Sequence, residues 1–322
     1  MQLDPERGYD LIGDIHGCGH ALARLLDQLG YRLQGGVWRH PRRQVIFLGD
    51  IIDRGPHIRE ALHLVHAMVD HGQAHCIMGN HEFNALGWYM PAPPGGGRDF
   101  VREHSPRFAR LLQETFQQFE HYPEEWKAFR EWFYDLPLFL ETERFRVVHA
   151  CWDSRVIARL RPLLNDGRIN PAILREAGLP GTFICQALDR LLRGTDMPLP
   201  EGMTLTSEEG FVRTFFRTKF WEENPQTYGD VVFQPDGLPE HAARLPLSPQ
   251  QKNRLFLYGP DEPLLFVGHY WRRGRPGPIR DNLACLDYSA VKNGKLVAYR
   301  LDQETRLDPI KFAWVDVQAV FR

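Results

Sequence analysis

Carboxylate, imidazole and amide side chains gather in three short, glycine-flanked phrases in the first quarter of the chain. The phrases are GDIHG at 13–17, GDIIDRG at 49–55 and GNHE at 79–82. They combine hard oxygen ligands with borderline nitrogen ligands, a donor set that suits Mn, Fe, Zn or Co. An arginine and a further histidine stand among the same groups. These residue types could hold divalent cations, bind an anionic substrate and deliver a proton.

The three phrases stand where a parallel sheet would bring them together. Each follows an apolar run typical of a buried strand, at 9–12, 44–48 and 74–78. The phrases begin at positions 13, 49 and 79, a spacing typical of one strand–helix–strand unit each. In open α/β sheets, ligands bind beyond the carboxyl ends of the strands. We therefore expect the phrases to line one edge of one sheet.

On these motifs the chain resembles the calcineurin-like metallophosphoesterases, above all the PPP-type phosphatases, which carry GDxHG, GDxxDRG and GNHE in this order. Two later blocks, VVHAC at 147–151 and LFVGH at 265–269, resemble the strand-then-histidine and Gly-His motifs of that family. The N-terminal third is also similar to bacterial bis(5′-nucleosyl)-tetraphosphatases, which open with a comparable YDxIGDIHGC phrase. The blocks span Asp10 to His269, and the motifs leave the stretch between the third and fourth blocks unexplained.

The resemblance implies a dinuclear metal site. Two cations ~3.5–4 Å apart can neutralise phosphate charge and lower the pKa of a bridging water, so that metal-bound hydroxide attacks phosphorus directly. Asp50, whose phrase lies between the other two, would be shared by both metals. Mn²⁺ is our first expectation, with Fe, Zn, Co and Ni as alternatives. The implied ligands are Asp14, His16 and Asp50 for the first metal, and Asp50, Asn80, His149 and His269 for the second.

The resemblance also implies the residues that act on the substrate. His81 would be the general acid, and Asp53 would orient it and keep it protonated, because a carboxylate partner raises the pKa of an imidazole. Arg54 would hold the phosphate oxygens with its planar fork. Arg217, in a basic cluster, is a weaker candidate for a second phosphate-binding arginine. The alternative is that this cluster is a solvated charged face. Glu82 would support the site rather than react.

Three positions depart from the family pattern, and two cysteines lie near predicted ligands in sequence. Ala150 and Cys151 occupy places where the family usually has two glycines, and Tyr270 follows the Gly-His motif where a small hydroxyl residue is common. The second histidine of a Gly-His-x-His phrase is missing, which favours the PPP-type ligand set. Cys18 and Cys151 lie near ligands in sequence, and we expect buried packing there rather than a redox role.

The motifs need a frame of helices and strands. Residues 10–78 predict a β-α-β-α-β order, with helices over about 20–29 and 58–70 and a hairpin turn at Gly35-Gly36. Alternating polar and apolar residues over 295–300 predict an antiparallel second sheet. The fold that the resemblance implies is α/β (α+β), a four-layer α-β-β-α sandwich in a single domain over 1–322.

A helical insertion is expected at about 90–136. It would contain two amphipathic helices, over about 106–120 and 123–134, and Ser105-Pro106 is a good start signal for the first. Two interpretations are open: a lid over the site, or a helical layer packed on the sheet.

Composition limits the class of protein and the compartment in which it would work. The chain has 322 residues, a net charge of −2 and 43% hydrophobic residues, which is typical of a globular protein and argues against a general nucleic-acid coat. Five cysteines form no CxxC pair, so reduced thiols in the cytoplasm are expected. Residues 1–7 contain no apolar leader, and no apolar run approaches the ~20 residues of a membrane helix.

The sequence thus predicts a metal-dependent hydrolase of phosphate esters or phosphoanhydrides. Symmetrical cleavage of dinucleoside polyphosphates is one candidate reaction, and phosphomonoester hydrolysis of the Ser/Thr protein phosphatase type is the alternative. Substrates would be phosphorylated small molecules, nucleotides or phosphoproteins, without nucleic acid or membrane partners. A cationic loop at 271–275 (WRRGR) could receive a polyphosphate or a base, or be a plain surface loop. A catalytically silent binding protein and a nuclease are less favoured.

Overall fold

A computed structural model gives the fold, and the residues it describes are 3–4, 7–95, 97–206, 210, 212–233 and 238–317. The chain forms two compact units. The first unit comprises Met1–Leu192 and Pro263–Arg322, and the second comprises Arg193–Glu262. The single-domain organisation expected from the sequence stays a prediction.

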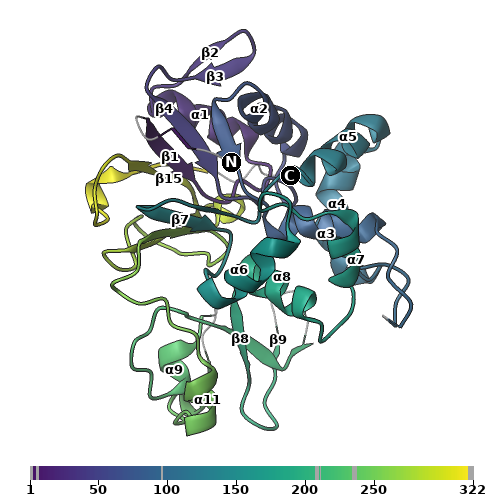
Figure 1. The fold of residues 1–322 in the computed structure, drawn as a ribbon, viewed down its shortest axis with the longest axis vertical. Helices are drawn as coiled ribbons and strands as arrows, with labels where there is room; N and C mark the ends of the chain where they lie inside the picture. Colours follow the sequence, from purple (N-terminus) through teal and green to yellow (C-terminus); the bar gives the residue numbers. More distant parts are fainter. Residues whose placement is uncertain are drawn as a thin grey trace. The chain divides into compact units, whose positions relative to one another are not determined.

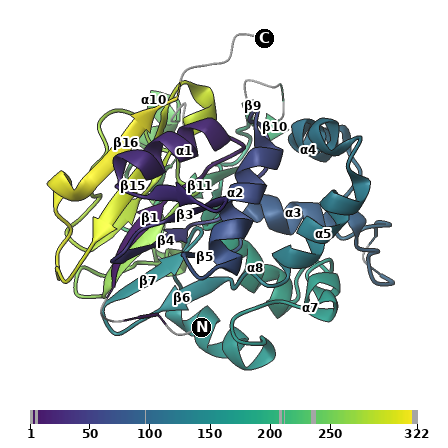
Figure 2. The same cartoon turned by 90° about the horizontal axis from the view of Figure 1, so that it is seen from above.

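The larger sheet of the first unit contains the strands that precede the three N-terminal motifs. β1 (Gly8–Ile12), β4 (Arg43–Phe47) and β5 (Ala74–Cys76) are parallel neighbours, as the β-α-β-α-β pattern predicts. The helices between them are α1 (Gly19–Gln28) and α2 (Ile58–Asp70). Both bury an apolar stripe, and Figures 1 and 2 show them beside β1 and β4. The carboxyl ends of these three strands therefore share one edge.

The prediction for residues 295–300 was right about the antiparallel strand and wrong about the sheet to which it belongs. β15 (Lys295–Leu301) is antiparallel, but it pairs with β1 and belongs to the larger sheet. The order of that sheet is β14-β15-β1-β4-β5, with β14 at Asp287–Tyr288 and with β16 (Phe312–Asp316) on β15. The strand is buried at almost every position because the core covers one face and α1 packs toward the other. Alternation reports the two faces of a strand and does not identify its partner strand.

The second sheet has the order β13-β12-β7-β6. β7 (Phe145–Val148), β12 (Leu264–Val267) and β13 (Leu283–Cys285) are parallel, whereas β6 (Phe139–Glu141) is antiparallel to β7. Apolar side chains of both sheets meet in one core cluster, which includes Tyr9, Leu11, Ile46, Phe145, Val147 and Phe266. This mixed α/β arrangement of two facing sheets with helices is the fold that the resemblance implies.

The helices expected between Asn80 and His149 are present. α3 (Asn80–Tyr89) follows β5, α4 (Pro106–Phe119) starts after Ser105 with proline in its first turn, and α5 (Pro123–Phe133) follows directly. Figure 2 shows α4 and α5 near α2 and α3. Gly96, within the predicted insertion, lies outside the described residues. α4 packs on α2, and α5 packs on α3 and α4. The role of this segment as a lid stays a prediction.

The remaining elements complete both units. A hairpin of β2 (Arg32–Gln34) and β3 (Val37–Arg39) turns at Gly35-Gly36 as predicted. The first unit also contains α6 (Ser154–Leu160), α7 (Pro171–Glu176) and α8 (Phe183–Arg193, whose last residue belongs to the second unit). Three short 3-10 helices lie at Arg161–Leu163, Ala290–Lys292 and Pro309–Lys311. Among the described residues, none of the helices combines the length and apolarity that crossing a bilayer requires.

The second unit has its own small core. It contains the paired strands β8 (Thr195–Pro198) and β11 (Phe215–Thr218), the pair β9 (Leu205–Thr206) and β10 (Val212–Arg213), and the short helices α9 (Tyr228–Val231), α10 (Glu240–Ala243) and α11 (Pro249–Arg254). The core side chains include Met197, Phe216, Tyr228, Val231 and Leu247.

Candidate dinuclear metal centre

Five strand ends of the first unit supply the predicted metal ligands. Two ligands follow β1 of the larger sheet, and one ligand each follows β4 and β5. Two histidines follow β7 and β12 of the second sheet. In chain order these are Asp14 and His16, Asp50, Asn80, His149 and His269. The structure therefore places all six at the carboxyl ends of strands, where the sequence analysis expects them.

Glycine lets these loops approach one another. A Cβ on Gly268 would lie 2.1 Å from Asp14 Oδ1, and a Cβ on Gly79 would lie 2.3 Å from both the backbone nitrogen and Oδ1 of Asp50. A side chain at either position would displace a predicted ligand. The Gly-His and GNHE motifs thus need their glycines for backbone contact, which the sequence alone signals only as a pattern.

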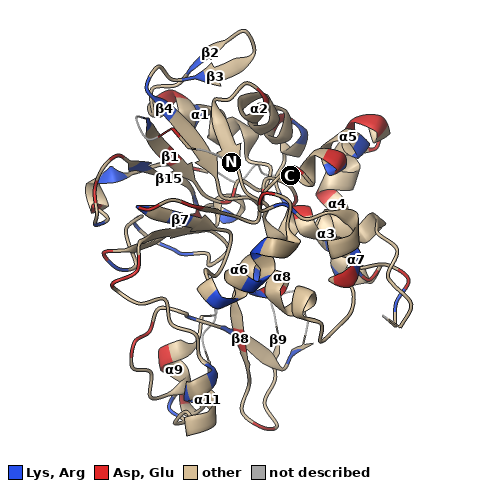
Figure 3. Cartoon of the chain, viewed as in Figure 1, with Lys and Arg blue, Asp and Glu red and all other residues tan. Residues whose placement is uncertain are grey.

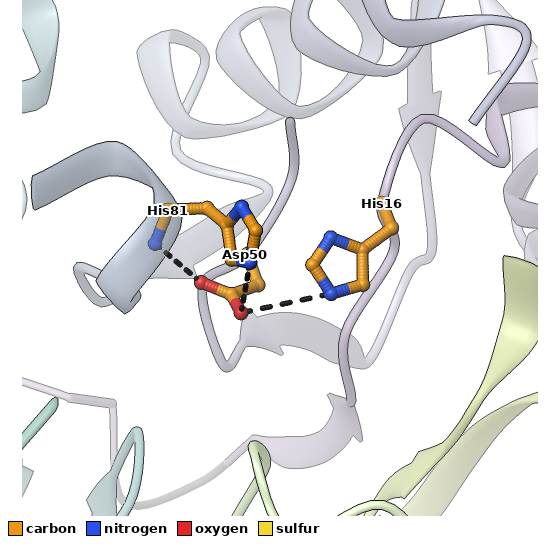
Figure 4. Close-up of side chains that lie close together, drawn as sticks. All are labelled: His16, Asp50 and His81. Atoms are coloured by element: carbon orange, nitrogen blue, oxygen red, sulfur yellow. Dashed lines mark hydrogen bonds and ion pairs between the residues drawn. The ribbon is translucent and has the colours of Figure 1, made fainter. Parts of the chain in front are cut away.

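Asp50 lies at the centre of the predicted ligands. Its Oδ2 is 3.3 Å from His149 Nε2 and 3.7 Å from His16 Nε2. Figure 4 shows Asp50 between His16 and His81, with its other oxygen accepting the backbone N–H of His81 at 2.9 Å. Asp50 also belongs to a second group with His149 and His269, whose donor atoms lie within 4.8 Å of one another. The first group consists of His16, Asp50 and His81 and does not include the predicted ligand Asp14. The Asp50 carboxylate belongs to both groups.

The orientation of the imidazoles fits bound cations. His16 Nδ1 is 2.9 Å from the Ile52 carbonyl and His149 Nδ1 is 2.7 Å from the Leu48 carbonyl, so each Nδ1–H has a backbone acceptor. In the neutral tautomer this leaves the Nε2 lone pair facing the Asp50 carboxylate. His149 Nε2 also lies 3.1 Å from Asn80 Oδ1. Such a cluster of acceptors needs a positive charge between them, and its oxygen and nitrogen donors suit divalent transition metals.

The pKa shifts show the same shortage of positive charge. Burial, together with the carboxylates of Asp287 and Asp50, raises the pKa of Asp14 well above its usual value. Burial would lower the pKa of His149, but the neighbouring Asp50 carboxylate outweighs it and raises that pKa to about 10. A proton or a cation is thus strongly held at this edge, and the residues present fit two divalent metal ions.

His81 and Asp53 form a buried pair beside the metal ligands. The two atoms His81 Nδ1 and Asp53 Oδ2 are 2.5 Å apart, and both side chains are almost fully buried. With Nδ1–H donated to the carboxylate, Nε2 points toward the Asp50 side of the site, 3.9 Å from its carboxylate. Arg54 is exposed and its two terminal nitrogens lie 3.1 Å from Nε2 of His16 and 3.1 Å from Nε2 of His81. A cationic fork therefore spans both imidazoles.

Glu82 ties two motif loops together. Its carboxylate accepts the backbone N–H groups of Asp50 at 2.9 Å, Ile51 at 2.8 Å and Gly79 at 3.0 Å. Burial and the nearby Asp50 raise the pKa of Glu82 to about 7. All its closest partners are backbone donors, so its place favours the predicted supporting role.

Two further predicted features are Arg217 and the cationic loop at 271–275. Arg217 belongs to the second unit, where it pairs with Asp196 across β11 and β8, and its proposed contact with substrate stays a prediction. In the 271–275 loop, the guanidinium carbon of Arg273 stands 5.0 Å from the ring centroid of Trp271. Cys18 and Cys151 are buried, and burial raises the pKa of the Cys18 thiol to about 12, which favours inert packing.

Sequence reasoning missed two residues that touch this region. Asp287 on β14 is buried, accepts the Ser289 N–H at 2.8 Å, and is close enough to raise the pKa of Asp14. An acid within the apolar run LACLDY was the available signal. Thr115 of α4 hydrogen-bonds to Asp53, and no local pattern marks it.

A separate surface group proves to be poorly arranged for a metal. His20, His57 and Glu60 bring three donor atoms together, and His20 Nε2 is 2.9 Å from the Glu60 carboxylate. The two imidazole rings are stacked, with centroids 3.7 Å apart and planes at 29°. Stacked rings direct their in-plane lone pairs side by side rather than toward one point, so we interpret the group as an ion pair.

Comparison with known proteins identifies the family. Residues 9–176, more than half of the chain, match the model described as calcineurin-like phosphoesterase. The chain belongs to the calcineurin-like phosphoesterase family. The matched residues include three of the strand ends of the larger sheet and that of β7, whereas Arg217 and His269 lie beyond them.

Curated relatives of this calcineurin-like phosphoesterase bear the name bis(5′-nucleosyl)-tetraphosphatase PrpE, asymmetrical. The protein of Halalkalibacterium halodurans is 46% identical over 83 residues, which is 26% of this chain and 33% of the relative. That of Oceanobacillus iheyensis is 32% identical over 142 residues, 44% of this chain and 54% of the relative. The chain thus spans between a third and about half of the length of these relatives.

Solved structures support the fold. A cold-active protein-tyrosine phosphatase of a psychrophilic Shewanella species is 16% identical, and the alignment covers 98% of this chain and 83% of that one with a TM-score of 0.50. At this identity the likeness concerns the fold and carries no statement about the substrate.

Proposed function

We propose that this calcineurin-like phosphoesterase hydrolyses phosphate esters or phosphoanhydrides with the help of two divalent metal ions. The observation that carries the proposal is Asp50, which belongs both to a donor group with His16 and His81 and to one with His149 and His269. We assign His81 to proton transfer rather than to metal binding because its Nδ1 pairs with the Asp53 carboxylate. One metal would be held by Asp14, His16 and Asp50. The other would be held by Asp50, Asn80, His149 and His269. When bound, the ions would neutralise phosphate charge and activate the attacking water.

The protein's own residues supply the remaining steps. Arg54 offers two parallel N–H donors on the open side of the site and would hold the phosphate oxygens. A phosphate bound there takes the donors that His81 Nε2 accepts in this structure, so Nε2 can carry a proton to the leaving oxygen. Asp53 fixes the Nδ1–H tautomer and stabilises the imidazolium. No residue is required to form a covalent phosphoenzyme.

The metal identity and the cellular setting belong to the proposal. Three oxygen-bearing and three imidazole side chains favour Mn²⁺, with Fe, Zn, Co and Ni as alternatives. All five cysteines are among the described residues and none forms a disulfide, which supports a reducing compartment such as the cytoplasm. Figure 3 shows acidic and basic residues mixed on α5, and the net charge is −2, so phosphorylated small molecules or phosphoproteins suit the chain better than nucleic acid.

Two substrate classes remain in the proposal. Dinucleoside polyphosphates come first, because the curated relatives carry that substrate in their name. Their name specifies asymmetrical cleavage, whereas symmetrical cleavage was the expectation from the sequence. Phosphomonoesters are the second class, supported by the complete GDxHG, GDxxDRG and GNHE set. A silent binding protein is disfavoured because the predicted ligands and the His81–Asp53 pair are all present.

Product analysis of purified full-length protein with Mn²⁺ and diadenosine tetraphosphate tests the function. ATP plus AMP would indicate asymmetrical cleavage, and ADP alone would indicate symmetrical cleavage. An aryl phosphate in the same run tests phosphomonoesterase activity, and a His81→Ala variant controls for contaminating enzymes. Failure to hydrolyse either substrate with Mn²⁺, Fe²⁺, Zn²⁺, Co²⁺ or Ni²⁺ would contradict the proposal.

A further inference from the structure

A helix without any catalytic motif makes direct hydrogen bonds to the loop that carries Asp53 and Arg54. That helix is α4, and the contacts come from Thr115 and Gln118, one helical turn apart. We propose that Thr115 positions the His81–Asp53 pair and that Gln118 positions the Arg54 loop. The inference rests on the proposed function, because it assigns roles in the same site.

Thr115 contacts Asp53 twice through one hydroxyl group. Its Oγ1 donates to Asp53 Oδ1 at 2.5 Å and accepts the backbone N–H of Asp53 at 3.2 Å. The other carboxylate oxygen, Oδ2, accepts from His81 Nδ1. Thr115 is fully buried, so its hydroxyl is shielded from bulk water. The carboxylate is thereby held from both sides, and its orientation sets that of the imidazole.

Gln118 holds the other end of the loop. Its Oε1 accepts the backbone N–H of Ile58 at 2.6 Å, and its Nε2 donates to the Gly55 carbonyl at 3.0 Å. Ile58 begins α2, whose preceding residue, His57, makes no side-chain capping bond in the described structure. The first N–H groups of a helix lack partners within it, so Gln118 acts as a cap supplied by another helix.

The loop needs such support because its backbone is strained. Asp53 has φ 71° and Arg54 has φ 69°, two consecutive non-glycine residues in the left-handed region. This region is unfavourable for residues with a Cβ, and it persists where surrounding contacts over-determine it. Thr115 bonds the first of these residues and Gln118 bonds Gly55, directly after the second. The α4 contacts thus bracket the strained pair.

The two contacts should affect different kinetic quantities. Loss of the Thr115 hydroxyl leaves the Asp53 carboxylate free to turn, which weakens proton delivery by His81. Proton delivery matters most when the leaving group is a poor one. Loss of the Gln118 amide displaces the loop that presents Arg54, which weakens binding of the phosphate. The first change should lower kcat and the second should raise KM.

The Thr115 test compares leaving groups. We expect Thr115→Val to lower kcat on phosphoserine, an alkyl ester, by about tenfold or more, but on p-nitrophenyl phosphate by less than about threefold. Thr115→Ser should restore both within about twofold, and bound metal should not change. Thr142→Val, which removes a hydroxyl from the turn before β7, is the matched control and should leave the ratio of the two rates unchanged. Equal losses on both substrates, or no rescue by serine, would overturn the assignment.

The Gln118 test uses a neighbour on the same helix. Gln118→Met should raise KM about tenfold with a smaller change in kcat, while Gln117→Met, the same change at an exposed position of α4, should leave both within about twofold. Identical kinetics for the two variants would overturn the role of Gln118.

A spectroscopic readout separates this inference from the proposed function. In ¹⁵N-histidine-labelled, Zn²⁺-loaded protein, the His81 Nδ1–H proton should give a low-field resonance, assigned by its loss in His81→Ala. We expect Thr115→Val to shift or broaden that resonance and Thr115→Ser to restore it. If wild-type protein hydrolyses neither substrate, the proposed function fails, and the resonance still decides the positioning. A resonance unchanged in Thr115→Val would overturn the Thr115 assignment.

Discussion

The motif loops and helix α4 act on the same side chains by different means. In the loops, residues proposed to bind metal also have an unusual backbone conformation: Asp50 and His16 have φ of 50° and 43°. Glycines allow one loop to contact the next. Helix α4 is an amphipathic helix that buries Leu112 and Phe119. It reaches the site through two polar side chains, Thr115 and Gln118. The loops thus carry the chemistry, and the helix carries its alignment.

We expect the largest loss of activity when the proton donor or its carboxylate partner is removed. We expect His81→Ala or Asp53→Asn to lower kcat on the order of 10²–10⁴-fold, because the leaving oxygen loses its proton donor or the donor loses its orientation. Bound metal should be retained, since neither side chain is among the proposed ligands. Kinetics with parallel elemental analysis measures both. Near-normal turnover in both variants would contradict the roles of the pair.

The next prediction compares the stability that Glu82 gives to the motif loops with the stability that Gln118 of α4 gives. Both carboxylate oxygens of Glu82 accept backbone N–H groups, so Glu82→Gln would turn an amide NH₂ toward buried donors. We expect the free energy of unfolding to fall by about 2 to 3 kcal/mol. Gln118→Met removes neutral hydrogen bonds and should cost about 1 kcal/mol. Denaturant unfolding of both variants checks the order, and equal stability of Glu82→Gln and wild type would contradict it.

The smallest effect concerns a motif residue without a chemical role. Cys18 directly follows the GDIHG phrase, but it is buried and its pKa of about 12 keeps it a thiol. We expect Cys18→Ala to retain activity within about twofold and iodoacetamide to leave the wild type active at neutral pH. Activity before and after alkylation measures this. Strong inactivation that Cys18→Ala abolishes would show a reactive thiol at the site.

Local patterns predicted the parts of the fold that depend on neighbours in sequence. The helices over 58–70 and 106–119 have apolar residues at helical spacing, and Ser105-Pro106 marks the start of the second, so the predictions agree with the structure within a residue or two. Strand pairing is a contact between distant residues. The alternation of 295–300 therefore could not tell that β15 lies beside β1.

The same distinction applies to the candidate site. The predicted ligands stand in glycine-containing phrases at strand ends, where residue type and spacing show the chemistry. Asp287 and Thr115 come from β14 and α4, and only the tertiary structure brings them to Asp14 and Asp53. Arg217 shows the reverse case, because its basic neighbourhood suggested a role that its place in the second unit leaves as a prediction.

The most direct test of the account is the metal content of wild type and Asp50→Asn. After loading with Mn²⁺ and removal of free metal by gel filtration, elemental analysis should find close to two ions per wild-type chain. Asp50→Asn should lose most of both, because Asp50 is the carboxylate shared by the two donor groups. Asn84→Asp, a change of the opposite charge sign at a buried position outside the proposed ligands, is the control. Equal metal content in wild type and Asp50→Asn would contradict a dinuclear centre built on this residue.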